Sequence, residues 1–229
     1  MKRMAVAAGT TGGGGNRLIC GIDETGRGSL LGPLVVAAVV VPSAMTGLLR
    51  DMGVRDSKKV APKKRQALYE FLTTHGEIAW GSTHISSEEI DLRRRRHETL
   101  NDVEASAMLA LARRLQRERP FASLQLDSVE SDAARFARPF AAVFGPAVEV
   151  LAACGADETC VAVSAASIVA KVERDAAVAR LAREAGAPLG SGYPADPLTK
   201  AFLALYYRAH GSLPPFIRHT WNIEKSYEQ

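Results

Sequence analysis

The chain of 229 residues has few cysteines and no long apolar run, and each absence excludes a class of protein. Its three cysteines, Cys20, Cys154 and Cys160, are odd in number and none stands in Cys-x-x-Cys spacing, so neither a disulfide framework nor a zinc knuckle is indicated. We expect them to be small, buried apolar side chains. No uninterrupted apolar window of about 18 residues occurs, and the glycine-rich start lacks a signal core. The sequence therefore predicts a cytoplasmic protein without a membrane anchor.

The composition is typical of one globular domain that meets an anionic partner. The fractions of 47% hydrophobic and 24% charged residues are those of a soluble fold with one sizeable core. The formal charge of +4 and the pI near 9.1 favour an anionic partner, and nucleic acid is the first candidate.

The stretch 19–28 joins an apolar run to two adjacent carboxylates and a Gly-Arg-Gly turn. Side chains alternate along a strand, so Asp23 and Glu24 can serve one site only near the strand end, where Gly26 and Gly28 free the backbone to bend. Two acids this close repel, and one would tend to be protonated near neutral pH unless a cation lay between them. The stretch therefore predicts a divalent metal site.

Apolar runs and turn residues predict an α/β fold. Strands are expected at 18–24, 34–41, 78–85, 121–126 and 148–153, and the second, apolar on both faces, is expected to be central and covered. Helices are expected at 62–72, after Ser86 as N-cap, at 101–117, at 132–144, from about 163 with Ser164 as cap, and at 196–210. Residues 1–16 end in a glycine run and are expected to be a flexible tail outside the fold.

Two further acids, Asp127 and Asp157, lie at or just past the ends of predicted strands. Carboxylates suit hard divalent cations, and no histidine or cysteine cluster in the sequence offers a zinc site instead. The segments 55–65 and 93–96 are rich in Lys and Arg, which is compatible with a solvated surface or with contacts to phosphate; both interpretations stay open here.

Once these motifs are set in order, they resemble type 2 ribonuclease H, also called ribonuclease HII. The resemblance runs from about residue 17 to 222 and rests on Gly21-Ile22-Asp23-Glu24-Thr25-Gly26-Arg27-Gly28, Asp56-Ser57-Lys58-Lys59, Leu126-Asp127-Ser128, Ala156-Asp157, Val163-Ser164-Ala165-Ala166-Ser167-Ile168, Lys171-Val172-Glu173-Arg174-Asp175 and Gly190-Ser191-Gly192-Tyr193-Pro194. The Asp127-Ser128 and Gly190 to Pro194 forms, with Arg218-His219-Thr220-Trp221, look like the archaeal and eukaryotic catalytic-subunit branch.

The resemblance implies an α/β, RNase H-like fold: a five-stranded mixed sheet flanked by helices, with a C-terminal helical extension. The catalytic domain would span residues 17–189, and the extension, residues 190–229, would pack on it. The implied activity is metal-dependent hydrolysis of RNA in RNA–DNA hybrids and at single ribonucleotides in duplex DNA, leaving 5′-phosphate and 3′-OH ends. Two divalent ions, Mg²⁺ or Mn²⁺, would serve each site.

The family motifs also imply roles for individual residues. The catalytic and metal-binding carboxylates would be Asp23, Glu24, Asp127 and Asp157. The ribose 2′-OH would be read by Gly26, Arg27, Gly28 and Tyr193. Contacts to phosphate are expected from Lys58, Ser164 and Lys171.

Three features depart from the family pattern. Gly155 stands where the related branch usually carries a lysine, which would weaken a phosphate contact. The sequence ends at Gln229 without the apolar, aromatic tail by which many relatives hold the replication clamp, so no clamp-binding tail is expected. The arginine run 93–96 is not part of the pattern. We expect a monomer whose partner is RNA–DNA hybrid or ribonucleotide-containing duplex DNA.

Two other functions remain as alternatives. One is another nuclease of the same fold, of the resolvase or exonuclease type, which would not need the Gly-Arg-Gly turn beside Tyr193 and would cut pure DNA. The other is a non-catalytic nucleic-acid-binding module, against which the presence of all four acids argues.

Overall fold

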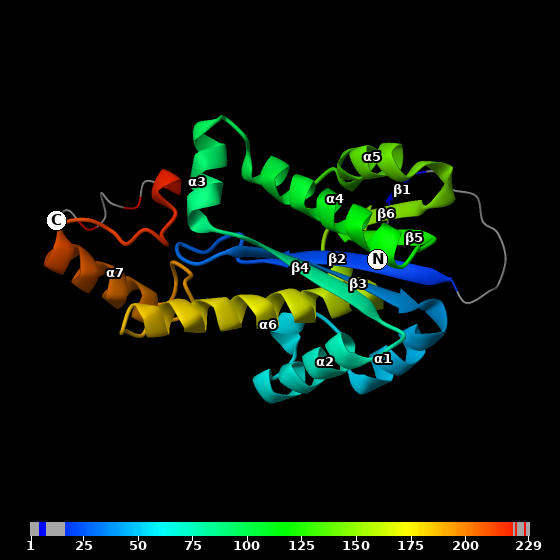
Figure 1. The fold of residues 1–229 in the computed structure, drawn as a ribbon, viewed down its shortest axis with the longest axis horizontal. Helices are drawn as coiled ribbons and strands as arrows, with labels where there is room; N and C mark the ends of the chain where they lie inside the picture. The colour runs from blue at the N-terminus through cyan, green and yellow to red at the C-terminus, as the bar shows by residue number, and fades with distance from the viewer. Residues whose placement is uncertain (1–4, 8–16, 222, 224–226, 228–229) are drawn as a thin grey trace. The chain divides into compact units, whose positions relative to one another are not determined.

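The computed structural model describes residues 5–7, 17–221, 223 and 227, which divide into two compact units (Figure 1). Unit 1 consists of Met1–Glu24, Val36–Thr83 and Glu104–Val172. Unit 2 consists of Thr25–Val35, His84–Val103 and Glu173–Gln229. Unit 2 therefore contains the expected C-terminal extension together with three segments of the expected catalytic domain.

Most of one six-stranded sheet lies in unit 1, with the strand order β1-β6-β5-β2-β3-β4. The strands are β1 (Ala5–Ala7), β2 (Leu18–Thr25), β3 (Leu34–Pro42), β4 (Ala79–Ile85), β5 (Ser123–Asp127) and β6 (Glu149–Ala153). Strand β5 runs parallel to β2 and β6, and β1 runs antiparallel to β6. The α/β class and the mixed sheet are confirmed.

Strand β1 adds a sixth strand to the five that the sequence predicts, all of which are present. It lies within residues 1–16, which the sequence predicts to be a tail outside the fold, and it pairs Ala5 with Ala152 and Ala7 with Val150. For residues 5–7 that prediction is wrong, because a three-residue edge strand is too short to show an alternating pattern. Residues 1–4 and 8–16 of the predicted tail lie outside the described residues.

Six of the seven described helices lie close to their expected positions, and α1 is an addition that the sequence does not predict. They are α1 (Thr46–Met52), α2 (Pro62–Thr74), α3 (Ser87–Arg95), α4 (Leu100–Glu118), α5 (Ala133–Phe144), α6 (Val161–Glu184) and α7 (Pro197–His210). Helix α3 begins after Ser86, whose hydroxyl accepts from the N–H of Glu89, as the capping pattern predicts. Asp196 caps α7 in the same way by accepting from the N–H of Leu198.

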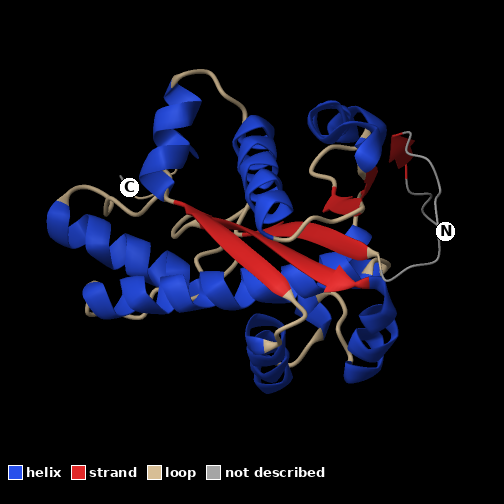
Figure 2. Cartoon of the chain, turned by 45° about the vertical axis from the view of Figure 1, so that its right-hand side comes forward, coloured by secondary structure: helices blue, strands red, loops and turns tan. Residues whose placement is uncertain are grey.

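The sheet of unit 1 is covered on both faces. Helices α4 and α5 lie on one side of it, and α1, α2 and the first half of α6 lie on the other (Figures 1 and 2). All nine residues of β3 are buried, which confirms the central, doubly covered strand expected from its apolar run. Cys20 and Cys160 are buried in this unit, Cys154 is half-buried, and all three are free thiols.

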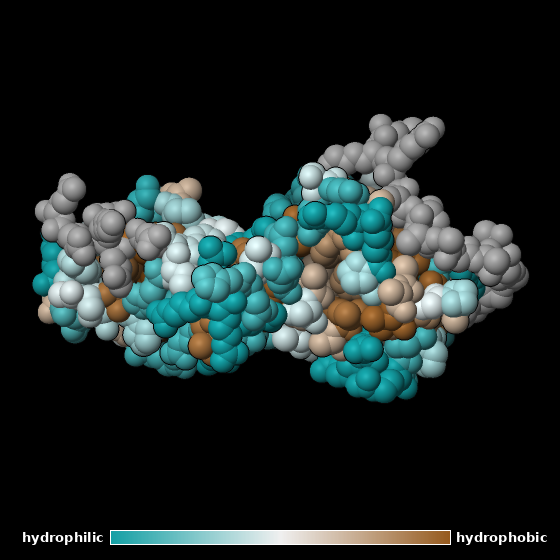
Figure 3. Space-filling view, turned by 90° about the horizontal axis from the view of Figure 1, so that it is seen from above, coloured by the Kyte–Doolittle hydropathy of each residue, from teal (hydrophilic) through white to brown (hydrophobic). Residues whose placement is uncertain are grey.

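Unit 2 has its own apolar core, built from segments far apart in the sequence. Its buried members are Leu30, Leu31, Val178, Leu189, Phe202, Leu203, Leu213 and Ile217. Residues of the predicted extension therefore share a core with residues 30–31 and with the second half of α6. On the face drawn in Figure 3, hydrophilic residues cover most of the surface and hydrophobic ones occupy smaller areas. Of the helices in the described part of the chain, none has the length and apolar character to span a bilayer.

Candidate active site

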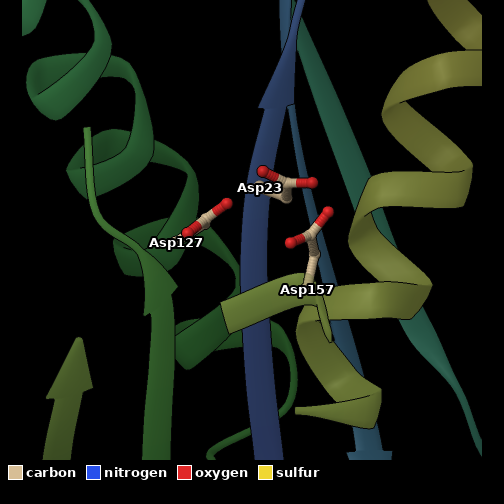
Figure 4. Close-up of side chains that lie close together, drawn as sticks. All are labelled: Asp23, Asp127 and Asp157. Carbon is tan, nitrogen blue, oxygen red and sulfur yellow. The ribbon is translucent and has the colours of Figure 1, made fainter. Parts of the chain in front are cut away.

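Three aspartates of unit 1 converge at the edge of the sheet. Asp23 lies on β2, Asp127 ends β5, and Asp157 lies in the single turn η4 (Ala156–Glu158) that precedes α6. One carboxylate oxygen from each lies within 4.8 Å of the others. Figure 4 shows the three side chains pointing toward one another. The structure thus brings together three of the four acids that the sequence selects.

The parallel register of β2 and β5 explains why two of these acids meet. Ile22 pairs with Leu126, and the next residue along each strand is an aspartate. Because parallel strands end at the same edge of a sheet, Asp23 and Asp127 reach that edge at the same level. Their proximity is therefore set by the backbone and does not depend on long, adaptable side chains.

Asp157 reaches the same edge through a tight turn after β6. Gly155 has a φ of +69°, in the left-handed region that favours glycine. The turn also aims the N–H of Ala156 at Asp127, whose Oδ1 accepts it at 3.0 Å. The glycine that replaces the usual family lysine thus occupies a position where the backbone itself favours glycine.

Helix α6 starts against β2 with almost no intervening side chain. A Cβ placed on Gly21 would overlap the main-chain carbonyl of Ala162 and lie against the N of Val163. Only glycine allows this approach of helix to strand, two residues before Asp23. The contact fixes the start of α6, and with it the turn that carries Asp157.

Burial and mutual repulsion disfavour the charged forms of these acids. Burial raises the pKa of Asp23 well above its ordinary value, and the charges of Glu24 and Asp127 raise it further, whereas a hydrogen bond from the Ser167 side chain lowers it. The pKa of Asp157 is raised to about 6, mainly by burial and then by the charge of Asp127. Burial also raises the pKa of Asp127, although the Ala156 N–H opposes this.

This donor set fits a hard divalent cation. Buried carboxylates that repel one another are held ionised when a dication lies between them. Oxygen donors select Mg²⁺, Mn²⁺ or Ca²⁺ rather than softer metals. In the described part of the chain, the group of three contains neither histidine nor cysteine, so a zinc site of the usual kind does not form here.

A second candidate feature lies within unit 2, where the Gly26-Arg27-Gly28 turn and Tyr193 are neighbours. Gly26 has a φ of +91°, and a Cβ on Gly28 would lie 3.9 Å from Cε1 of Tyr193. Arg27 donates from Nη2 to Oδ1 of Asn101 at 2.5 Å. The turn and the tyrosine, 165 positions apart in the sequence (193 minus 28), thus form one local cluster.

Comparison with known proteins identifies the family of the chain. The family model for ribonuclease HII matches residues 20–224. The chain belongs to the ribonuclease HII family. Ribonuclease HII of Thermococcus onnurineus is 39% identical over 211 residues, covering 92% of this chain and 90% of that protein. The family prediction is therefore confirmed, and the chain is a metal-dependent endoribonuclease.

Solved structures of archaeal members share the fold. The crystal structure of ribonuclease H2 from Pyrococcus horikoshii matches with a TM-score of 0.81 at 35% identity, covering 93% of this chain and 99% of that one. A PCNA:RNase HII complex from Archaeoglobus fulgidus contains a chain that matches with a TM-score of 0.77 at 33% identity, covering 89% of this chain and 95% of that one. The sequence predicts no clamp-binding tail in the present chain, and residues 222, 224–226 and 228–229 lie outside the described residues.

Glu24, the fourth acid of the family motif, is placed differently from the other three. It lies outside the group of three aspartates and is half-buried, and its N–H donates to Oδ1 of Asp23 at 2.8 Å. Strand β2 continues past both acids to Thr25, so neighbouring side chains still alternate. Glu24 nevertheless acts on Asp23 through its charge, because it contributes to the raised pKa of that residue.

Two of the three expected phosphate contacts, Lys58 and Ser164, have distinct surroundings. Lys58 is exposed, and its charge lowers the pKa of both Asp127 and Asp157, which places it on the side of the acids. Ser164 is not a helix cap as predicted, because α6 already begins at Val161. Its buried hydroxyl donates to the Asp157 carbonyl at 2.7 Å, which anchors the turn.

Ser167 is a site residue that its sequence motif does not single out. Its side chain hydrogen-bonds Asp23, and its Oγ lies 2.9 Å from Oγ of Ser57, within hydrogen-bond distance. Residues three and four apart share a helix face, so Ser164, Ser167 and Lys171 form one stripe along α6. That spacing is the signal in the sequence that could have identified it.

Proposed function

We propose that this ribonuclease HII hydrolyses the RNA strand of RNA–DNA hybrids and also cuts on the 5′ side of single ribonucleotides embedded in duplex DNA. The products would carry 5′-phosphate and 3′-OH ends. The observation that carries the proposal is the convergence of Asp23, Asp127 and Asp157 at one edge of the sheet. The cluster of the Gly26-Arg27-Gly28 turn with Tyr193 supports the recognition of ribose.

Asp23, Asp127 and Asp157, with Glu24, would hold two Mg²⁺ or Mn²⁺ ions. When bound, such ions lower the pKa of an attacking water and neutralise charge on the leaving 3′-oxygen. The protein orients these ligands through neighbouring donors: Ser167 hydrogen-bonds Asp23, and the Ala156 N–H fixes Asp127. Such contacts hold the carboxylates in place before the metal and substrate arrive.

The 2′-OH is the group that distinguishes a ribonucleotide from a deoxyribonucleotide. Gly26 and Gly28 carry no side chains, so a sugar can approach the backbone of the turn closely. Tyr193 offers a ring that packs on the sugar and a hydroxyl that forms a hydrogen bond. Along the chain, the turn begins two residues after Glu24, so the carboxylate motif and the ribose-reading motif are covalently continuous.

The direct test uses an end-labelled duplex with a single ribonucleotide. We expect one cut on the 5′ side of that nucleotide in Mg²⁺ and none in EDTA. An all-DNA duplex of the same sequence is the control, and it should remain intact. Cutting of the all-DNA duplex would favour a resolvase-type or exonuclease-type function, and binding without any cut would favour the non-catalytic alternative.

Tyr193→Ala should slow the cut at a lone ribonucleotide strongly. The loss of a hydrogen-bond partner and of a packing surface is worth about 10²-fold or more in kcat/KM when a site reads one hydroxyl. Duplex affinity in Ca²⁺ and the melting temperature should remain close to wild type, because Tyr193 is only half-buried. A wild-type cutting rate in this variant would assign selectivity to the turn alone.

Lys58→Glu should flatten the salt dependence of duplex binding. If Lys58 contacts phosphate, the slope of log K against log salt in Ca²⁺ should fall by about one. The matched control is Arg113→Glu, an exposed charge reversal on α4 in the same unit. Equal slopes in the two variants would exclude a specific phosphate contact at Lys58.

A further inference from the structure

Unit 2 buries two arginines that the proposed chemistry does not yet use. Arg174 on α6 and Arg218 in the C-terminal segment are both 0% exposed. Burying a guanidinium is costly unless it is paired and hydrogen-bonded, so each of these side chains calls for a physical explanation. Both contact the cluster of the Gly26-Arg27-Gly28 turn and Tyr193.

The Arg218 side chain hydrogen-bonds main-chain carbonyls of the turn. Its Nη1 donates to the carbonyl of Arg27 and its Nη2 to the carbonyl of Gly26, each at 2.6 Å. Two parallel donors on one planar group fix orientation as well as distance. The guanidinium also lies over the Trp221 ring, with 5.0 Å from Cζ to the ring centroid, in a cation–π contact. The two carbonyls of the turn are thus held in fixed directions.

Holding these carbonyls also directs the N–H groups of the turn. A peptide unit is planar and trans, so its N–H points opposite to its C=O. The carbonyls of Gly26 and Arg27 point at Arg218, so the N–H groups of Arg27 and Gly28 point away from it. These are the main-chain donors that a ribose hydroxyl would meet at the turn.

Arg174 lies between the turn and the loop that carries Tyr193. A Cβ on Gly26 would lie 2.8 Å from its Nε, and a Cβ on Gly192 would lie 3.0 Å from its Nη2. Its Nη2 donates to the Ser191 carbonyl at 2.8 Å, and its Cζ lies 4.7 Å from the ring centroid of Tyr193. The side chain therefore supports the face of the tyrosine ring.

The bonding of Arg174 is incomplete for a residue whose only task is stability. Within the described residues, its Nε and Nη1 have no hydrogen-bond acceptor. The Asp175 carboxylate lies 3.9 Å from Nη1, beyond hydrogen-bond distance. A buried donor left without an acceptor destabilises the fold, which is the pattern expected when a residue serves the site at the expense of stability.

We propose that Arg174 and Arg218 are positioning residues that set the selectivity for ribose, Arg174 through Tyr193 and Arg218 through the Gly26-Arg27-Gly28 turn. The inference rests on the proposed function, because it concerns the same recognition of a ribonucleotide. Neither arginine touches substrate in this scheme. Arg174 keeps Tyr193, and Arg218 keeps the turn, in the geometry that contacts the 2′-OH, and does so before the substrate binds.

A double-mutant cycle tests whether Arg174 acts through Tyr193. Arg174→Met, measured on the lone-ribonucleotide duplex, should lower kcat by about 10–100-fold and change KM by less than about 3-fold, because misplacing a recognition group by about 1 Å costs that much. In the Tyr193→Ala background the same change should have less than about a 3-fold effect, since coupled residues are not additive. Arg180→Met, an exposed arginine on the same helix, is the control and should leave kcat unchanged.

Arg218→Lys tests whether Arg218 acts through the Gly26-Arg27-Gly28 turn, because lysine keeps the charge but cannot hold two carbonyls in a plane. We expect kcat to fall about 10-fold or more while duplex affinity in Ca²⁺ stays within about 3-fold. All rates are divided by the fraction of protein that binds duplex in Ca²⁺, which removes any misfolded material. If Arg218→Lys does not fold, the cycle on Arg174 and Tyr193 decides.

The possible outcomes separate the inference from the function on which it rests. If the wild-type protein does not cut the lone-ribonucleotide duplex, the proposed function fails. If the wild type cuts it and the effects of Arg174→Met and Tyr193→Ala multiply, Arg174 acts only on the fold and the inference is wrong. Loss of duplex binding in either arginine variant, at unchanged kcat, would also overturn it.

Discussion

Asp23→Asn is expected to lower kcat by about 10³-fold or more at saturating Mg²⁺ while the fold and the duplex affinity survive. Asparagine keeps the size of the side chain but removes the charge that holds a metal ion among three acids. The measurement is single-turnover cleavage of a hybrid duplex, with binding followed separately in Ca²⁺. The matched control is Asp51→Asn, an exposed aspartate on α1 in the same unit, which should cut at the wild-type rate.

The same substitution should stabilise the metal-free protein. Burial and neighbouring acids raise the pKa of Asp23, so the folded state binds its proton more tightly than the unfolded chain does. The contribution of such a group to the free energy of unfolding is fully present below the unfolded pKa, about 3.9, and is lost as pH rises through the folded pKa. For Asp157 that window runs from about 3.9 to about 6.

The pH dependence of melting therefore separates the metal site from an ordinary cluster of acids. Without metal, the melting temperature of the wild type should fall between about pH 4 and pH 7, and Asp23→Asn should raise it by a few degrees at pH 7 but not at pH 4. Adding Mg²⁺ or Mn²⁺ should stabilise the wild type more than the variant. Retention of more than about a tenth of the wild-type cleavage rate, or equal stabilisation by metal, would count against Asp23 as a ligand.

Much of the sheet and of the acid cluster could be predicted from the sequence because both depend on local patterns. The positions of Asp23, near the end of β2, and of Asp127, at the end of β5, follow from apolar runs that stop at a carboxylate. Their meeting follows from the general rule that parallel strands end at the same edge. Asp157 lies just past a further predicted strand, and the family motif supports its selection over other loop acids.

The rest could not be predicted because it depends on contacts between distant positions. Arg218 bonds Gly26 across 192 positions, and Ser167 meets Ser57 across 110. Each looks like an ordinary surface or helix residue in its own segment. Similarly, β1 is a strand because it pairs with β6, and nothing in the sequence of its three small residues predicts that pairing.

Gly21→Ala is expected to be among the most damaging substitutions outside the acids themselves. The added Cβ would overlap the main-chain carbonyl of Ala162, and neither β2 nor the first turn of α6 can move without disturbing the aspartates. Overpacking of a core costs about 1–3 kcal/mol, and a clash with backbone lies at or above the upper end. For a protein of this size, a loss of about 3 kcal/mol lowers the melting temperature by about 6–12 °C.

Gly21→Ala should also impair function, because the shift that relieves the clash disturbs the site. Relief of the clash must separate β2 from α6, and this moves the turn of Asp157 away from Asp23, so metal affinity and cleavage should fall even at temperatures where the variant is folded. Gly47→Ala is the control: this glycine lies in α1 with no atom near its would-be Cβ, so alanine there should be neutral or stabilise by up to about 1 kcal/mol. A Gly21→Ala protein with wild-type melting and wild-type Mn²⁺ affinity would show that the start of α6 can shift without moving Asp157, and that the close approach at Gly21 does not set the geometry of the site.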